Sequence, residues 1–114
     1  FVGRKDDVIN SGGYRIGPGE VEECLMRHDA VALAAVIGVP DRVRGEIVKA
    51  FIVPKKGVRV DKQLEESIKT RVRTSLEAYA YPREIEFVEE LPMTTTGKIM
   101  RGELRRREKK GEKG

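Results

Sequence analysis

"AVALAAVIGV", residues 30–39, is a continuous apolar run in a chain of which 37% is charged. A second run, "IVKAFIV" at residues 47–53, follows it after a short polar loop and ends at Pro54. Apolar side chains at successive positions, rather than at every second one, are typical of strands buried on both faces. We therefore expect these two runs to pair within a sheet that helices cover.

The residues before this pair predict a hairpin and a helix. Short apolar segments flank the turn-forming sequence "NSGG", residues 10–13, which is the composition of a tight turn between two strands. Pro18 suits the first turn of a helix. Apolar and aromatic-ring side chains then recur at helical spacing: Val21, Cys24, Leu25 and His28.

The residues after the pair predict two more helices and one strand. Asp61 is a candidate cap for a helix that ends before Tyr81-Pro82. Its apolar stripe has a spacing of four: Leu64, Ile68, Val72 and Leu76. Ile85 and Phe87 alternate in a strand, and residues 100–110 have helical composition. The fold class is thus α+β: a small domain with an N-terminal β-hairpin and a central, roughly three-stranded sheet covered by helices.

Size and composition favour one small domain that forms part of a larger protein. With 114 residues the chain is small for an enzyme that handles a nucleotide and a second substrate, so we expect residues 1–110 to be one domain and 111–114 a frayed tail. No stretch approaches the ~20 apolar residues of a membrane span. The single cysteine, Cys24, forms no internal disulfide, which fits a reducing compartment.

The net charge of +4 leaves a small basic RNA-binding module as an alternative. The excess lies in residues 101–114, with seven Lys/Arg and three Asp/Glu, whereas the rest of the chain is neutral. The six Phe and Tyr residues form no obvious stacking platform, and no nucleic-acid motif is present. A solvated helix end accounts for the tail better, so we expect no nucleic-acid partner.

"LPMTTTGKIMR", residues 91–101, presents Lys98 after a glycine and three threonines. It is not a P-loop, because Pro92 stands where the first glycine belongs and Ile99 stands where a metal-binding hydroxyl belongs. A flexible ammonium beside a glycine suits a phosphate or carboxylate oxygen. Elsewhere, one His and one Cys provide no metal-ligand cluster, and His28 fits a packed or helix-terminal role better than a catalytic one.

Two long motifs together resemble the C-terminal motifs of the adenylate-forming superfamily, which contains acyl-CoA synthetases, peptide-synthetase adenylation domains and luciferases. They are "GRKDDVINSGGYRIGPGEVE", residues 3–22, and "YPREIEFVEELPMTTTGKIMR", residues 81–101. Within the superfamily the chain is most similar to medium-chain acyl-CoA synthetases. The resemblance implies a mobile lid domain that closes over a large N-terminal domain in two orientations, one for each half-reaction. That larger domain, which would bind ATP with Mg²⁺ and the acid, lies outside this sequence, so the isolated chain is expected to be inactive.

The resemblance also assigns roles to single residues. Lys98 matches the lysine that approaches the carboxylate and the α-phosphate of ATP during adenylation. Asp6 matches the hinge residue, and Arg4 matches an arginine near the nucleotide ribose.

Other positions correspond to the binding of coenzyme A. Gly13, Tyr14 and Arg15 match the segment that lines the pantetheine channel, and Arg44 and Arg73 match basic positions near the CoA nucleotide. A carrier-protein phosphopantetheine arm in place of free CoA is the alternative within the superfamily. The expected partners are the chain's own N-terminal domain, ATP, a carboxylic acid and CoA, in the cytoplasm or an organelle matrix.

Overall fold

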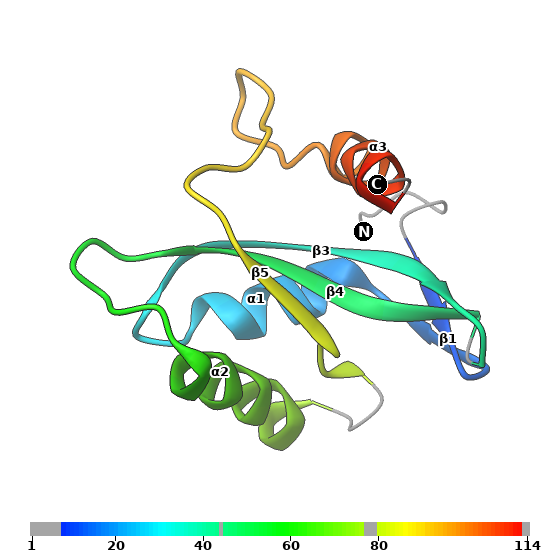
Figure 1. Ribbon diagram of the computed structural model, residues 1–114, viewed down its shortest axis with the longest axis horizontal. Helices are drawn as coiled ribbons and strands as arrows, with labels where there is room; N and C mark the ends of the chain where they lie inside the picture. The colour runs from blue at the N-terminus through cyan, green and yellow to red at the C-terminus, as the bar shows by residue number, and fades with distance from the viewer. Residues whose placement is uncertain (1–7, 44, 77–79, 113–114) are drawn as a thin grey trace.

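The computed structural model describes residues 8–43, 45–76 and 80–112. Five strands and three helices follow one another in the chain (Figure 1). Their bounds are β1 Ile9–Ser11, β2 Tyr14–Ile16, α1 Pro18–Met26, β3 Val31–Asp41, β4 Gly45–Pro54, α2 Lys62–Ser75, β5 Glu84–Phe87 and α3 Arg101–Glu112. This architecture confirms the predicted α+β class. None of the described helices is long and apolar enough to cross a membrane.

The two apolar runs form the long antiparallel pair β3–β4, as predicted. Its register extends from Val31↔Pro54 to Asp41↔Gly45, with one irregularity between Val31 and Leu33. β5 joins the other edge of β4 in parallel, which completes the three-stranded centre. The β1–β2 hairpin continues the sheet through the pairing of Ser11 with Gly45, so the full sheet has five strands and β3 lies at one edge.

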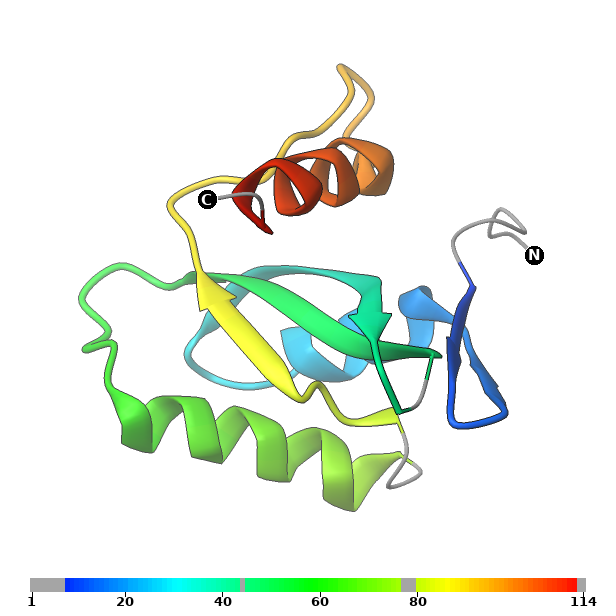
Figure 2. The same ribbon diagram turned by 45° about the vertical axis from the view of Figure 1, so that its right-hand side comes forward.

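The sheet has an apolar cluster on each face. Helices α1 and α2 lie on one face and α3 lies on the other, as both ribbon views show (Figures 1 and 2). Successive residues of β3 divide between the clusters: Ala34 and Val36 belong to the α1/α2 side, and Ala35 and Ile37 belong to the α3 side. This division explains why the run is apolar at every position and confirms the predicted burial on both faces.

Local sequence signals account for the helix starts. Pro18 occupies the first turn of α1, where its missing N–H costs no hydrogen bond. The Asp61 carboxylate accepts a hydrogen bond from the Leu64 N–H at 2.9 Å and caps α2 as predicted. The stripe of α2 packs on the core through the buried Ile68 and Val72.

Candidate functional site

Lys98 lies on a small hairpin between β5 and α3. Residues 93 and 99 form a β-bridge, and the Thr94 N–H donates to the Lys98 carbonyl at 2.8 Å. The Lys98 N–H in turn donates to Thr94 Oγ1 at 3.0 Å, and the Gly97 N–H closes the turn onto the Thr94 carbonyl. Gly97 has φ of 86°, the left-handed conformation that the residue before Lys98 needs in such a three-residue turn.

The threonines hold this hairpin together by their hydroxyl groups. Thr94 Oγ1 lies 3.0 Å from Thr96 Oγ1 and also accepts the Lys98 N–H. The side chain of Lys98 is exposed, and no ion pair joins it to any residue that the structure describes. A fixed backbone therefore presents an ammonium group toward solvent, where an anionic ligand can approach it.

The base of the hairpin is anchored to the α3 face of the sheet. The Met100 N–H donates to the Pro92 carbonyl at 2.9 Å, which ties the two legs together. Leu91 before the hairpin and Leu104 after it are both buried in the cluster on this face, and Ile99 packs against the same cluster. The hairpin thus projects from a packed base (Figure 2).

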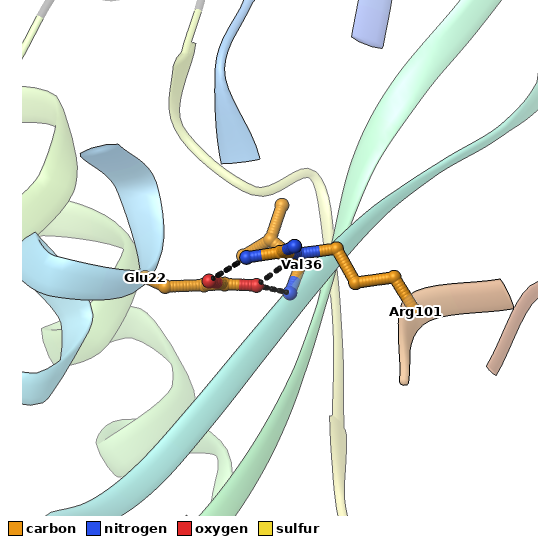
Figure 3. Close-up of polar contacts among 3 residues, drawn as sticks. All are labelled: Glu22, Val36 and Arg101. Atoms are coloured by element: carbon orange, nitrogen blue, oxygen red, sulfur yellow. Dashed lines mark hydrogen bonds and ion pairs between the residues drawn. The ribbon is translucent and has the colours of Figure 1, made fainter. Parts of the chain in front are cut away.

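A buried ion pair fixes the start of α3. Arg101 Nε donates to Glu22 Oε2 at 2.8 Å, and Arg101 Nη2 donates to Glu22 Oε1 at 2.5 Å. Glu22 Oε2 also accepts the Val36 N–H at 2.8 Å. Figure 3 shows the glutamate reaching from α1 and the arginine from α3 to meet beside β3. The Glu22 side chain is only 6% exposed, so this contact is desolvated.

The β1–β2 hairpin carries Gly13, Tyr14 and Arg15. Gly12 and Gly13 have φ of 58° and 88°, and positive values at both turn positions match the type I′ turn that connects two-residue hairpins. No atom beyond the neighbouring residues lies within 4 Å of a Cβ placed on Gly13. Tyr14 and Arg15 are exposed beside it. The turn is therefore an open surface on which a narrow ligand can pass close to the backbone.

Arg73 forms part of a stacked cluster at the end of α2. Its guanidinium lies 5.0 Å from the centroid of the Tyr81 ring, and the Arg83 guanidinium lies 5.2 Å from the same ring. Both arginines are exposed. Arg83 was not a candidate in the sequence. The stack forms only because the fold brings Arg73, near the end of α2, and Arg83, just before β5, onto the same tyrosine ring.

The structure separates the predicted site residues into distinct places. In both ribbon views the hairpin of residues 93–99 lies beside α3, away from the β1–β2 hairpin (Figures 1 and 2). Arg4, Asp6 and Arg44 lie outside the described residues. The ion pair of Glu22 and Arg101 was not predicted, since 79 positions separate its partners.

The remaining polar candidates have structural roles or none. His28 accepts the Ala30 N–H on Nδ1, which leaves its Nε2–H to donate to Ser67 Oγ at 2.9 Å. His28 follows the end of α1 and is half-buried, so these bonds agree with the helix-terminal part of the predicted packed or helix-terminal role. Within the described ranges no group of three or more His, Cys, Asp or Glu side chains is arranged to hold a metal ion.

Comparison with known proteins places these features in a family. Residues 20–98 match the family model of the AMP-binding enzyme C-terminal domain. Over its whole length the chain is 58% identical to 4-hydroxybutyrate–CoA ligase 1 of Metallosphaera sedula, of which it covers 21%. Over 95% of its length it is 54% identical to the human mitochondrial acyl-coenzyme A synthetase ACSM1, of which it covers 19%. The chain therefore spans about a fifth of the length of these curated relatives.

Solved structures agree with the sequence relatives. The acyl-CoA synthetase of Brucella canis superposes with a TM-score of 0.91 at 52% identity, over 98% of this chain and 21% of that one. The anthranilate–CoA ligase AuaEII, solved with anthranoyl-AMP, superposes with a TM-score of 0.86 at 45% identity, over 92% of this chain and 20% of that one. The resemblance that the two sequence motifs suggested is confirmed: this chain belongs to the family of AMP-binding enzyme C-terminal domains, and its relatives are acyl-CoA synthetases.

Proposed function

We propose that the chain is the mobile C-terminal domain of an AMP-forming acyl-CoA synthetase. In the first half-reaction a carboxylate oxygen attacks the α-phosphorus of ATP, and the bond to pyrophosphate breaks. In the second, the CoA thiol loses its proton and attacks the acyl carbonyl carbon, and AMP leaves. The relatives are named as CoA ligases and acyl-CoA synthetases, which supports both the acid and the thiol substrate. A medium-chain acid is proposed from the resemblance of the two sequence motifs alone.

The observation that carries the proposal is that Lys98 has a hydrogen-bonded backbone and an exposed ammonium group. Carboxylate and triphosphate are both anionic, so their approach is opposed by repulsion that a fixed cation offsets as charge redistributes in the transition state. The 93–99 hairpin holds the Lys98 backbone by hydrogen bonds on both its N–H and its carbonyl, and leaves the ammonium exposed. Lys98 acts by electrostatics in this scheme and forms no covalent intermediate.

The second half-reaction uses a different part of the domain. Gly13, with Tyr14 and Arg15, borders the path of the pantetheine arm, and the open space at the turn supports that role. Arg73 and Arg44 serve the CoA nucleotide, by pairing with phosphates or stacking on adenine. In both ribbon views the hairpin of residues 93–99 and the β1–β2 turn lie apart, which favours a rotation of the domain between the half-reactions (Figures 1 and 2).

Two residues outside the described ranges complete the proposal for this chain. Asp6 is proposed as the hinge and Arg4 as a contact to the ribose. The described residues supply no metal-ligand cluster, so Mg²⁺ is assigned to the triphosphate within the larger domain, and no step here depends on it. The enzyme is placed in the cytoplasm or an organelle matrix. Two arginines suited to phosphates favour free CoA over a carrier-protein arm as the thiol donor.

The test compares the two half-reactions in the full-length enzyme. We expect Lys98→Ala to lower acid-dependent ATP–pyrophosphate exchange about 10²–10³-fold, the loss typical of one stabilising group in a transition state. Thioester formation from pre-made acyl-adenylate should change little. Lys56→Ala, which removes another exposed lysine in a turn, is the matched control. Equal losses in both half-reactions, or intact exchange, would show that Lys98 does not have this role.

A further inference from the structure

The position of Arg101 is electrostatically unfavourable unless an acidic group pairs with it. It is the first residue of α3, where the helix dipole disfavours a cation and where the neighbouring Glu103 is the favourable charge. Its side chain is nonetheless drawn inward and is only 19% exposed. The Glu22 carboxylate resolves this conflict, since its two oxygens receive both nitrogens of the arginine fork.

The same carboxylate is tied to the sheet. β3 is an edge strand, and Glu22 Oε2 accepts the backbone N–H of Val36. Glu22 is itself held by α1, whose Val21 and Leu25 are fully buried in the core on the other face. The ion pair thus passes beside the edge strand and joins α3 to the packed α1 (Figure 3).

A short, hydrogen-bonded path leads from this pair to Lys98. Arg101 follows Met100, whose N–H is bonded to the Pro92 carbonyl. Ile99 pairs with Met93, and Lys98 pairs with Thr94. Both residues between the arginine and the lysine are therefore paired with the opposite leg of the hairpin, which gives a short connected path between the two side chains.

We infer that Glu22 and Arg101 are positioning residues for the adenylation half-reaction, because they set the angle at which the 93–99 hairpin leaves the domain. The inference rests on the proposed function of Lys98. It predicts that the ion pair affects the rate of ATP–pyrophosphate exchange, which engages Lys98. The pair should have little effect on thioester formation, in which the β1–β2 turn faces the adenylate.

The experiment uses the full-length enzyme with Glu22→Gln, Arg101→Gln and Arg101→Lys. Glu22→Gln retains an acceptor for the Val36 N–H but removes the charge that holds the arginine. Since a displacement of about 1 Å can cost ~10²-fold in rate, we expect Glu22→Gln and Arg101→Gln to lower ATP–pyrophosphate exchange at least about tenfold. Thioester formation from pre-made acyl-adenylate should stay within about twofold of wild type, because it does not use the hairpin.

Conservative rescue and a control separate positioning from folding. Arg101→Lys keeps a cation but loses the fork geometry, so its exchange rate should lie between those of wild type and Arg101→Gln. If Arg101→Gln fails to fold, Arg101→Lys and Glu22→Gln still carry the test. Glu103→Gln is the control, because it removes a carboxylate of the same helix turn that pairs with the exposed Arg106 and Arg107.

The outcomes distinguish the inference from the proposal beneath it. Selective loss of exchange in the Glu22 and Arg101 variants, with Glu103→Gln unchanged, supports the positioning role. Parallel loss in both half-reactions, or no loss in either, shows that the pair only stabilises the fold and overturns the inference. If Lys98→Ala itself leaves exchange intact, the proposed function is wrong and this inference falls with it.

Discussion

Replacing Arg101 by methionine should destabilise the domain strongly, because it removes two of the three hydrogen bonds that the Glu22 carboxylate accepts. The Glu22 side chain is 6% exposed, and its three hydrogen bonds come from Arg101 Nε, Arg101 Nη2 and the Val36 N–H. Removal of the arginine leaves a buried charge with one backbone donor. Breaking a buried pair from one side costs about 3–5 kcal/mol in free energy of unfolding. Since Arg101 is 19% exposed and water can partly replace it, we expect about 3 kcal/mol.

A double-mutant cycle by urea denaturation of the 114-residue chain measures this effect. Glu22→Gln alone should cost less, about 1–3 kcal/mol, because a neutral amide oxygen still accepts the Val36 N–H. Adding Glu22→Gln to Arg101→Met should recover stability relative to the sum of the single changes, since no unpaired charge remains, with a coupling of about 1–3 kcal/mol. Single effects that add to within about 0.5 kcal/mol would refute the reasoning, because partners in one buried network do not behave independently.

Two further predictions concern other parts of the domain. In the full-length enzyme, Gly13→Leu should slow thioester formation and spare ATP–pyrophosphate exchange. Gly13→Ala, which carries the same cost of about 1–2 kcal/mol for a side chain at positive φ without the bulk, is its control, and equal CoA use in both variants would contradict the channel assignment. Asp61→Ala should lower the free energy of unfolding by about 1 kcal/mol through loss of the α2 cap, and Asp61→Asn should restore most of it; a denaturation midpoint unchanged by Asp61→Ala would show that the cap does not contribute.

The local elements of this fold were predictable because each has a local cause. Burial on both faces requires apolar residues at every position of β3, and the type I′ turn requires residues that accept positive φ, such as Gly12 and Gly13. The arrangement of the strands was less accessible. β5 lies parallel to β4, and the β1–β2 hairpin joins the sheet through Ser11 and Gly45. Alternation in a sequence reveals which face of a strand is buried, but not which strand lies beside it.

In the candidate site too, the features with a local cause were predictable and those that depend on tertiary structure were not. Lys98 was a candidate from its own neighbourhood, since a lysine after a glycine and three threonines suits a phosphate or carboxylate oxygen, but its role in adenylation came only from the resemblance of two long motifs. The structure supplies a reason for two of the three threonines before it: the hydroxyl groups of Thr94 and Thr96 hydrogen-bond to each other, and Thr94 Oγ1 also accepts the Lys98 N–H. Side-chain bonds of this kind compete with regular backbone pairing, so their contribution depends on a turn geometry that composition does not specify.

The ion pair of Glu22 and Arg101 was missed because each partner looks ordinary by itself: a glutamate in a charged helix and an arginine before a basic tail. A signal did exist, since an arginine at the first position of a helix opposes the helix dipole. Departures from local preference of this kind tend to mark positions where a distant partner or a function determines the residue. In this domain Arg101 of α3 pairs with a buried carboxylate on α1, and the paired residues 99 and 100 then connect that ion pair to the lysine that we assign to adenylation.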